Sequence, residues 1–138
     1  MIFSDKHVAW PGDEDTPLSW RHWYKRAVAH SVTQIRGAER WIATYPDRIF
    51  IDPDCKQKLP IPLRPPERRI VHGIVVTSGI REACIRHFNG GIGSLALDAR
   101  IKGDADIKNG TAPPFTVGDP DTDGSFIHIM MRCRSTLP

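Results

Sequence analysis

The chain has 138 residues, a formal net charge of +3 and 40% hydrophobic residues. This length suits one domain, and a charged fraction of 25% is typical of globular proteins. The sequence contains no run of about 18 apolar residues, which is the length that a membrane-spanning helix needs. Its N-terminal region also lacks the apolar core of a signal peptide. Three cysteines without a CxxC pair exclude a disulfide scaffold. We therefore expect a cytoplasmic or virion protein with no membrane partner.

The N-terminal part predicts an extended arm followed by a long helix. In residues 1–16, apolar side chains lie among acidic and turn-forming residues with no helical or strand period. Pro17 suits a first helical position, and apolar residues then recur at helical spacing from Trp20 to Tyr45. The sequence thus predicts a helix over 17–45 at the start of a single domain, 17–138.

Proline and turn residues divide the middle of the chain. Residues 53–66 hold five prolines, which predicts an extended crossover on the surface. Residues 69–102 contain three β-rich runs separated by the turn dipeptides Ser78-Gly79 and Asn89-Gly90. This pattern predicts an antiparallel β-meander over 69–102.

The last third is predicted as a loop and one more strand. Residues 103–124 hold five aspartates and several glycines and prolines, which favours a long acidic loop. Residues 125–134 alternate as a final strand. The expected fold is α+β, with one long N-terminal helix packed on an antiparallel sheet of about four or five strands.

One face of the predicted sheet is basic and partly aromatic. If alternate side chains share a face, this face collects a set of candidate anion-binding residues: Arg100, Lys102, Phe126, His128, Arg132 and Arg134. Arginines bind phosphate and aromatic rings stack on bases, so the face could recognise an anion, a nucleotide or a nucleic acid. A subunit interface and a solvated face are the two alternatives.

Acid–base chemistry is a further reading of the same sheet. Glu82, Arg86 and His128 are residue types that serve in acid–base catalysis on phosphodiesters. A helix packed on an antiparallel sheet that bears such groups is similar to the layout of small microbial ribonucleases. No local motif accompanies the three residues, so the sequence favours a protein that is not an enzyme.

The aspartates of the acidic loop have the spacing of a calcium-binding turn. Asp119, Asp121 and Asp123 match the first half of an EF-hand loop. The position of the bidentate glutamate falls on Met130, which excludes a true EF-hand. A calcium clip and a plain Asp/Gly turn remain the alternatives, and no other cofactor is indicated.

The charge is unevenly distributed along the chain. Residues 1–16 carry one lysine against four acidic residues, residues 17–102 carry fifteen basic against seven acidic residues, and residues 103–124 carry one lysine against five aspartates. Such asymmetry permits charge complementarity between copies. We therefore expect a homo-oligomer or a subunit of a larger assembly.

The leading functional hypothesis is a non-enzymatic assembly or structural protein that acts through protein–protein contacts. A small phage or viral virion component of the connector, decoration or tail type has this character. The alternatives are a small anion-, nucleotide- or nucleic-acid-binding protein, such as a phage-type inhibitor or ligand sponge that uses the basic sheet face, and a small ribonuclease-like enzyme.

Overall fold

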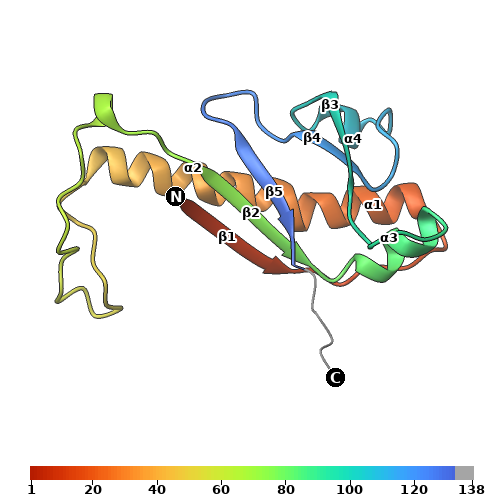
Figure 1. Cartoon of the computed structure of the whole chain (residues 1–138), viewed down its shortest axis with the longest axis horizontal. Coiled ribbons are helices and arrows are strands. Elements are labelled where there is room, and N and C mark those ends of the chain that lie inside the picture. Colours follow the sequence, from red (N-terminus) through yellow and green to blue (C-terminus); the bar gives the residue numbers. More distant parts are fainter. Residues whose placement is uncertain (133–138) are drawn as a thin grey trace.

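A computed structural model describes residues 1–132 of the chain (Figure 1). The end of the predicted strand 125–134, including Arg134, lies outside these residues. The helices and strands, in chain order, are β1 Ile2–His7, α1 Thr16–Tyr24, the π-helix η1 Lys25–Ala29, α2 His30–Thr44, the 3-10 helix η2 Pro66–Arg68, β2 Gly73–Ser78, α3 Arg81–His87, β3 Ala96–Lys102, α4 Ala105–Lys108, β4 Thr116–Asp119 and β5 Ile127–Met131.

The single long helix of the prediction is present and is built from α1, η1 and α2 without a break. Asp15 caps its start, because its carboxylate accepts a hydrogen bond from the Leu18 N–H at 2.9 Å. Pro17 lies in the first turn, and the helix ends where Tyr45 leaves the helical conformation. The π-turn in its middle was not predicted. No helix among residues 1–132 is both long and apolar enough to cross a membrane.

Gly37 in α2 is expected to weaken the long helix. A Cβ added there meets nothing within 4 Å. Gly37→Ala should therefore raise the free energy of unfolding by about 1 kcal/mol, because alanine loses less backbone entropy in a helix. Urea denaturation measures the change. The matched control is Gly73→Ala, whose Cβ would lie 2.9 Å from Ile35 Cγ2 and should destabilise. A loss of stability in Gly37→Ala would contradict this account.

The sheet differs from the prediction in the direction of every strand pair. Strands β1, β2 and β5 form a three-stranded sheet in the order β1-β2-β5, and both pairs are parallel. Strands β3 and β4 form a separate parallel pair. The predicted antiparallel meander of four or five strands is therefore wrong. Alternation of side chains reports that a segment is a strand but carries no information about strand direction.

Two local assignments explain this error. Residues 81–87 form helix α3, not the second strand of a meander. Ile80, Ala83 and Cys84 are buried there at helical spacing. Residues 2–7 form β1, not an arm, and their backbone pairs with β2 from Ile2↔Gly73 to His7↔Ser78. The predicted acidic loop likewise holds α4 and β4.

The long helix organises two cores along its length. Its C-terminal half, α2, packs on the three-stranded sheet, where Ile35, Val75 and Ile127 are buried together. Its N-terminal half contacts α3, α4, β3 and β4 in a larger cluster around Trp20 and Trp23. Figure 1 shows the three strands crossing one side of the helix, with α3, α4, β3 and β4 gathered at its α1 end.

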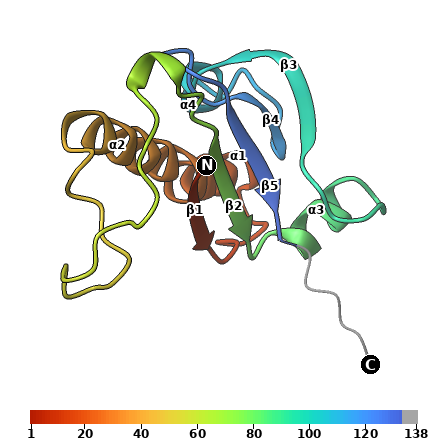
Figure 2. The same ribbon diagram turned by 60° about the vertical axis from the view of Figure 1, so that its left-hand side comes forward.

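The proline-rich segment leaves the body of the molecule. After α2 the chain forms a small hairpin, in which Phe50 and Lys58 pair as an antiparallel bridge. Asp52 holds the turn, because its carboxylate accepts hydrogen bonds from the N–H groups of Lys56 and Gln57. The hairpin extends away from the sheets in both views (Figures 1 and 2), so it does not contribute to either core.

Candidate functional site

The three-stranded sheet has one open face. It consists of the outward side chains of β1, β2 and β5: Phe3, Asp5, Ile74, Val76, His128 and Met130. Strand register places Phe3, Ile74 and His128 in one row across the strands, and Asp5, Val76 and Met130 in the next. Phe3 is 58% exposed and Met130 is 51% exposed, while Ile74 is buried between its neighbours. We call these six residues the open sheet face.

The opposite face of the same sheet is covered. Val75 and Ile127 point toward α2 and pack against Ile35. Ser4 on β1 also faces the helix, where its hydroxyl donates to Gln34 Oε1 at 3.2 Å. Parallel sheets are almost always covered on both faces. A parallel sheet with a helix on one side and exposed Phe3 and Met130 on the other thus has two of the three layers of the usual arrangement.

The open sheet face is electrostatically balanced. Arg132, which follows β5, forms an ion pair with Asp5 of β1 and so reaches across β2. The Arg132 N–H also donates to the Thr77 carbonyl at 2.8 Å, which continues the β2–β5 pairing. At the other end, the His128 ring lies 4.9 Å from the ring of Phe126 and 6.3 Å from that of His72. The apolar middle therefore lies between an ion pair and a group of rings.

The predicted basic face does not form as one surface. Phe126, His128 and Arg132 lie on or beside β5, but Arg100 and Lys102 lie on β3 in the second sheet. Arg134 lies outside the described residues. The sequence could not separate the two groups, because each strand alone shows the same alternation.

Each described basic side chain of that predicted face is also paired with a carboxylate. Arg100 bonds both oxygens of Asp98, at 3.0 and 2.8 Å, and its hydrogen bonds lower the pKa of Asp98 to about 2. Lys102 Nζ lies 3.9 Å from Asp119, and Arg132 pairs with Asp5. These pairs offset the positive charge that an anion would need.

The catalytic candidates lie on different elements. Glu82 and Arg86 are one turn apart on α3, while His128 is on β5. Arg86 Nε donates to Asp13 at 2.9 Å, and His128 contacts aromatic rings. The structure brings Glu82 and Arg86 together on one helix but gives His128 different neighbours.

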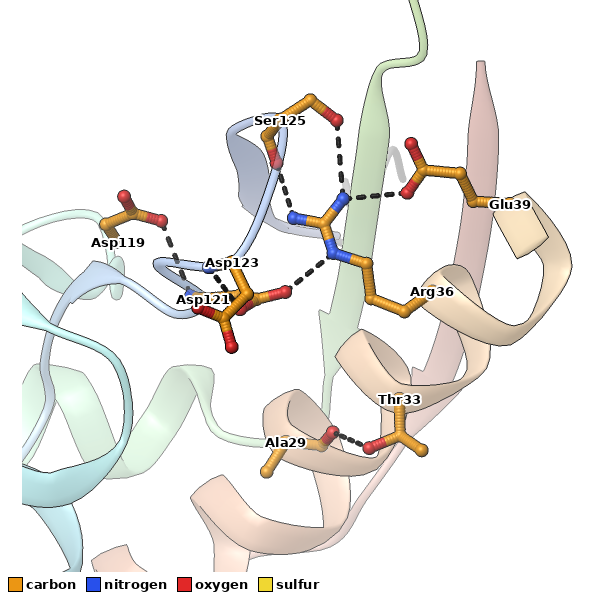
Figure 3. Close-up of polar contacts among 8 residues, drawn as sticks. All are labelled: Ala29, Thr33, Arg36, Glu39, Asp119, Asp121, Asp123 and Ser125. Atoms are coloured by element: carbon orange, nitrogen blue, oxygen red, sulfur yellow. Dashed lines mark hydrogen bonds and ion pairs between the residues drawn. The ribbon is translucent and has the colours of Figure 1, made fainter. Parts of the chain in front are cut away.

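One of the candidate calcium residues, Asp121, pairs with an arginine that the sequence analysis missed. Arg36 of α2 donates from Nε to Asp121 at 2.6 Å, from Nη1 to Glu39 at 2.8 Å and from Nη2 to the Ser125 carbonyl at 2.6 Å (Figure 3). Asp121 Oδ1 also accepts from the Asp123 N–H at 2.9 Å. The guanidinium thus holds the β4–β5 connection against the long helix.

The calcium clip stays a prediction, and two of its three carboxylates already face a basic side chain. The Asp121 carboxylate faces the Arg36 guanidinium, and Asp119 lies near Lys102. Among residues 1–132, no three histidine, cysteine, aspartate or glutamate side chains are grouped closely enough to hold a metal ion. The Asp/Gly turn alternative describes the observed backbone hydrogen bonds, because Asp119 and Asp121 each accept from an N–H two residues on.

We compared the chain with protein-family models, with curated proteins and with solved structures, and none of the three comparisons gave a match. They therefore lend no support to the predicted virion component.

Proposed function

We propose that the chain is an association module that pairs with a second copy of itself through the open sheet face. The observation that carries the proposal is the parallel sheet β1-β2-β5, which has α2 on one face and exposed apolar side chains on the other. Covering that face would remove Phe3 and Met130 from water, which is favourable by the hydrophobic effect.

The charge balance of the face favours a second copy. Asp5 and Arg132 neutralise each other within one chain, so two copies can approach without bringing like charges together. A twofold axis along β2 would set β1 of each copy over β5 of the other. In that arrangement the protruding Phe3 side chain would meet the row that contains His128. A closed twofold pair is also the commonest form of homo-oligomer.

The size of the face sets the expected strength of association. Three strands about 4.8 Å apart and roughly 18 Å long cover on the order of 250 Å². A standard interface buries about 800 Å² on each partner, so flanking residues such as Phe126, which is exposed and lies against His128, would have to contribute. We therefore expect reversible pairing with a dissociation constant of about 1–100 µM.

Sedimentation velocity over a concentration series tests the proposal. The double variant Phe3→Glu/Met130→Glu should weaken pairing at least about tenfold, since four carboxylates would meet in the interface. Both side chains are exposed, so the variant should still fold. The matched control is Leu97→Glu, because Leu97 is 77% exposed on β3 outside the open sheet face. A chain that stays monomeric at about 500 µM, or a control that weakens pairing equally, would overturn the proposal.

A further inference from the structure

A pocket of about 390 Å³ lies between the long helix and α4. The helix contributes Arg21, Tyr24 and Lys25, and α4 contributes Ile107 and Lys108. Leu18, one turn before Arg21, completes an apolar wall with Ile107. This volume falls within the usual range for small-molecule sites, which combine apolar walls with a few polar groups. The pocket shares no residue with the open sheet face.

The π-turn forms one side of this pocket. The first and last residues of η1, Lys25 and Ala29, both line it. The His30 N–H bonds to the Lys25 carbonyl five residues back, so the helix holds one extra residue in this turn. Such π-turns are rare and frequently occur at functional sites. The extra residue changes the direction of the side chains that follow it, so the helix surface beside the pocket is irregular.

The pocket carries unbalanced positive charge. Three cationic side chains line it against one carboxylate, that of Asp104. Asp104 bonds Lys108 at 2.6 Å. In the part of the chain that the structure describes, neither Arg21 nor Lys25 has a carboxylate within 4.0 Å. Arg100, Lys102 and Arg132 differ in this respect, since each has an acidic partner.

Tyr24 adds a hydrogen-bond donor. Tyr24 is 3% exposed and lines the pocket. Burial raises the pKa of Tyr24 above its ordinary value, and the charges of Asp104 and Asp119 add to the shift. The phenol therefore stays protonated at neutral pH and can donate to an anion.

We infer that this pocket binds a small organic phosphate, with the phosphate between Arg21 and Lys25 and the apolar part against Leu18 and Ile107. Arginine and lysine side chains with free donors are the usual phosphate ligands of proteins. The two apolar side chains distinguish this ligand class from a bare inorganic anion.

Isothermal titration calorimetry with adenosine 5′-monophosphate as the probe tests the inference, with adenosine and inorganic phosphate as comparison ligands. The nucleotide should bind at least about tenfold more tightly than either comparison ligand, because only it uses both parts of the pocket. Arg21→Gln and Lys25→Gln should each weaken its binding about tenfold. The control is Arg26→Gln, which removes the same charge from an exposed position of η1 outside the pocket.

Three results would overturn the inference. The first is no heat of binding with up to about 5 mM nucleotide at low salt. The second is equal binding of the nucleotide and inorganic phosphate, which would remove the role of the apolar wall. The third is an equal loss in Arg26→Gln, which would assign binding to the general positive charge of the helix and not to this pocket. Circular dichroism of each variant checks that its fold is intact, which is expected for Lys25→Gln because Lys25 is exposed.

Discussion

Replacing Trp23 with alanine is expected to lower the free energy of unfolding by about 4 kcal/mol, the usual cost of truncating a buried tryptophan. Trp23 is fully buried, and its ring stacks on Trp20 with 5.5 Å between the ring centroids. Its Nε1 donates to the Val8 carbonyl at 2.9 Å. The side chain thus joins the long helix to the segment that follows β1, and its loss would leave both a cavity and an unpaired carbonyl.

The control for this effect is Trp41→Ala. Trp41 lies on the same helix but is 48% exposed, and its main contacts are Tyr45 and the Arg48 guanidinium. We expect a loss of less than about 1 kcal/mol there. Urea denaturation followed by circular dichroism measures both variants. Equal losses at the two positions would show that the core around Trp20 and Trp23 is not the main source of stability.

Arg36→Ala is the second substitution with a large expected effect, a loss of about 2–3 kcal/mol. Hydrogen bonds between charged groups in partly buried sites contribute about 1.5–3 kcal/mol, and Arg36 makes several (Figure 3). Its removal would leave the Asp121 carboxylate and the Ser125 carbonyl without their partner. The variant should also release the β4–β5 connection, so hydrogen exchange should rise at residues 120–126.

The effect of Arg36 should depend on pH. Burial alone would raise the pKa of Asp121, but the hydrogen bonds from Arg36 and the Asp123 N–H outweigh it, so the pKa lies below its ordinary value of 3.8. A lowered carboxylate pKa stabilises the fold above about pH 4, and this contribution is lost as the pH falls through the folded-state pKa. The stability difference between the wild type and Arg36→Ala should therefore shrink below about pH 4.

Arg40→Ala is the matched control for this pair of predictions. Arg40 is exposed one turn later on α2, and no ion pair of Arg40 is present within residues 1–132. We expect a change within about 0.5 kcal/mol and no dependence on pH in the acidic range. A stability loss in Arg36→Ala that is the same at pH 3 and pH 7 would contradict the assignment of Asp121 as its main partner.

The long helix was predictable because its signal is local. Apolar residues recur every three to four positions over the whole of 17–45, and Pro17 marks the start. The π-turn gives no such signal, since one inserted residue changes the period only over a single turn. The pocket beside η1 was missed for this reason.

The sheet was not predictable in the same way. The run 80–88 follows Ser78-Gly79, which favours a hairpin, and the helical spacing of Ile80, Ala83 and Cys84 is too short to outweigh that signal. In β1, Ile2 and Ser4 face the helix, and Ser4 is a polar residue with a partner on α2. Because Ser4 is polar, the segment does not show the alternation of apolar and polar residues that would have indicated a strand.

The open sheet face was predictable only in part. Alternation along the last strand places Phe126, His128 and Met130 on one outward side, and the structure agrees. Their neighbours are contributed by β1 and β2, which are distant in sequence and run parallel to β5. Long-range strand order is set by tertiary packing, so no local pattern could have paired Phe3 with Ile74 and His128.

The most direct test of the central claim is to map which face is covered as the chain concentration rises. Methyl resonances in nuclear magnetic resonance spectra report this for Ile74, Val76 and Met130 of the open sheet face, and for Leu97 and Ile61 elsewhere. We predict concentration-dependent shifts at the first three and none at Leu97, which lies on β3, or at Ile61 in the proline-rich segment. Shifts that are confined to Leu97 or Ile61, or a spectrum that does not change up to about 500 µM, would contradict pairing through the open sheet face.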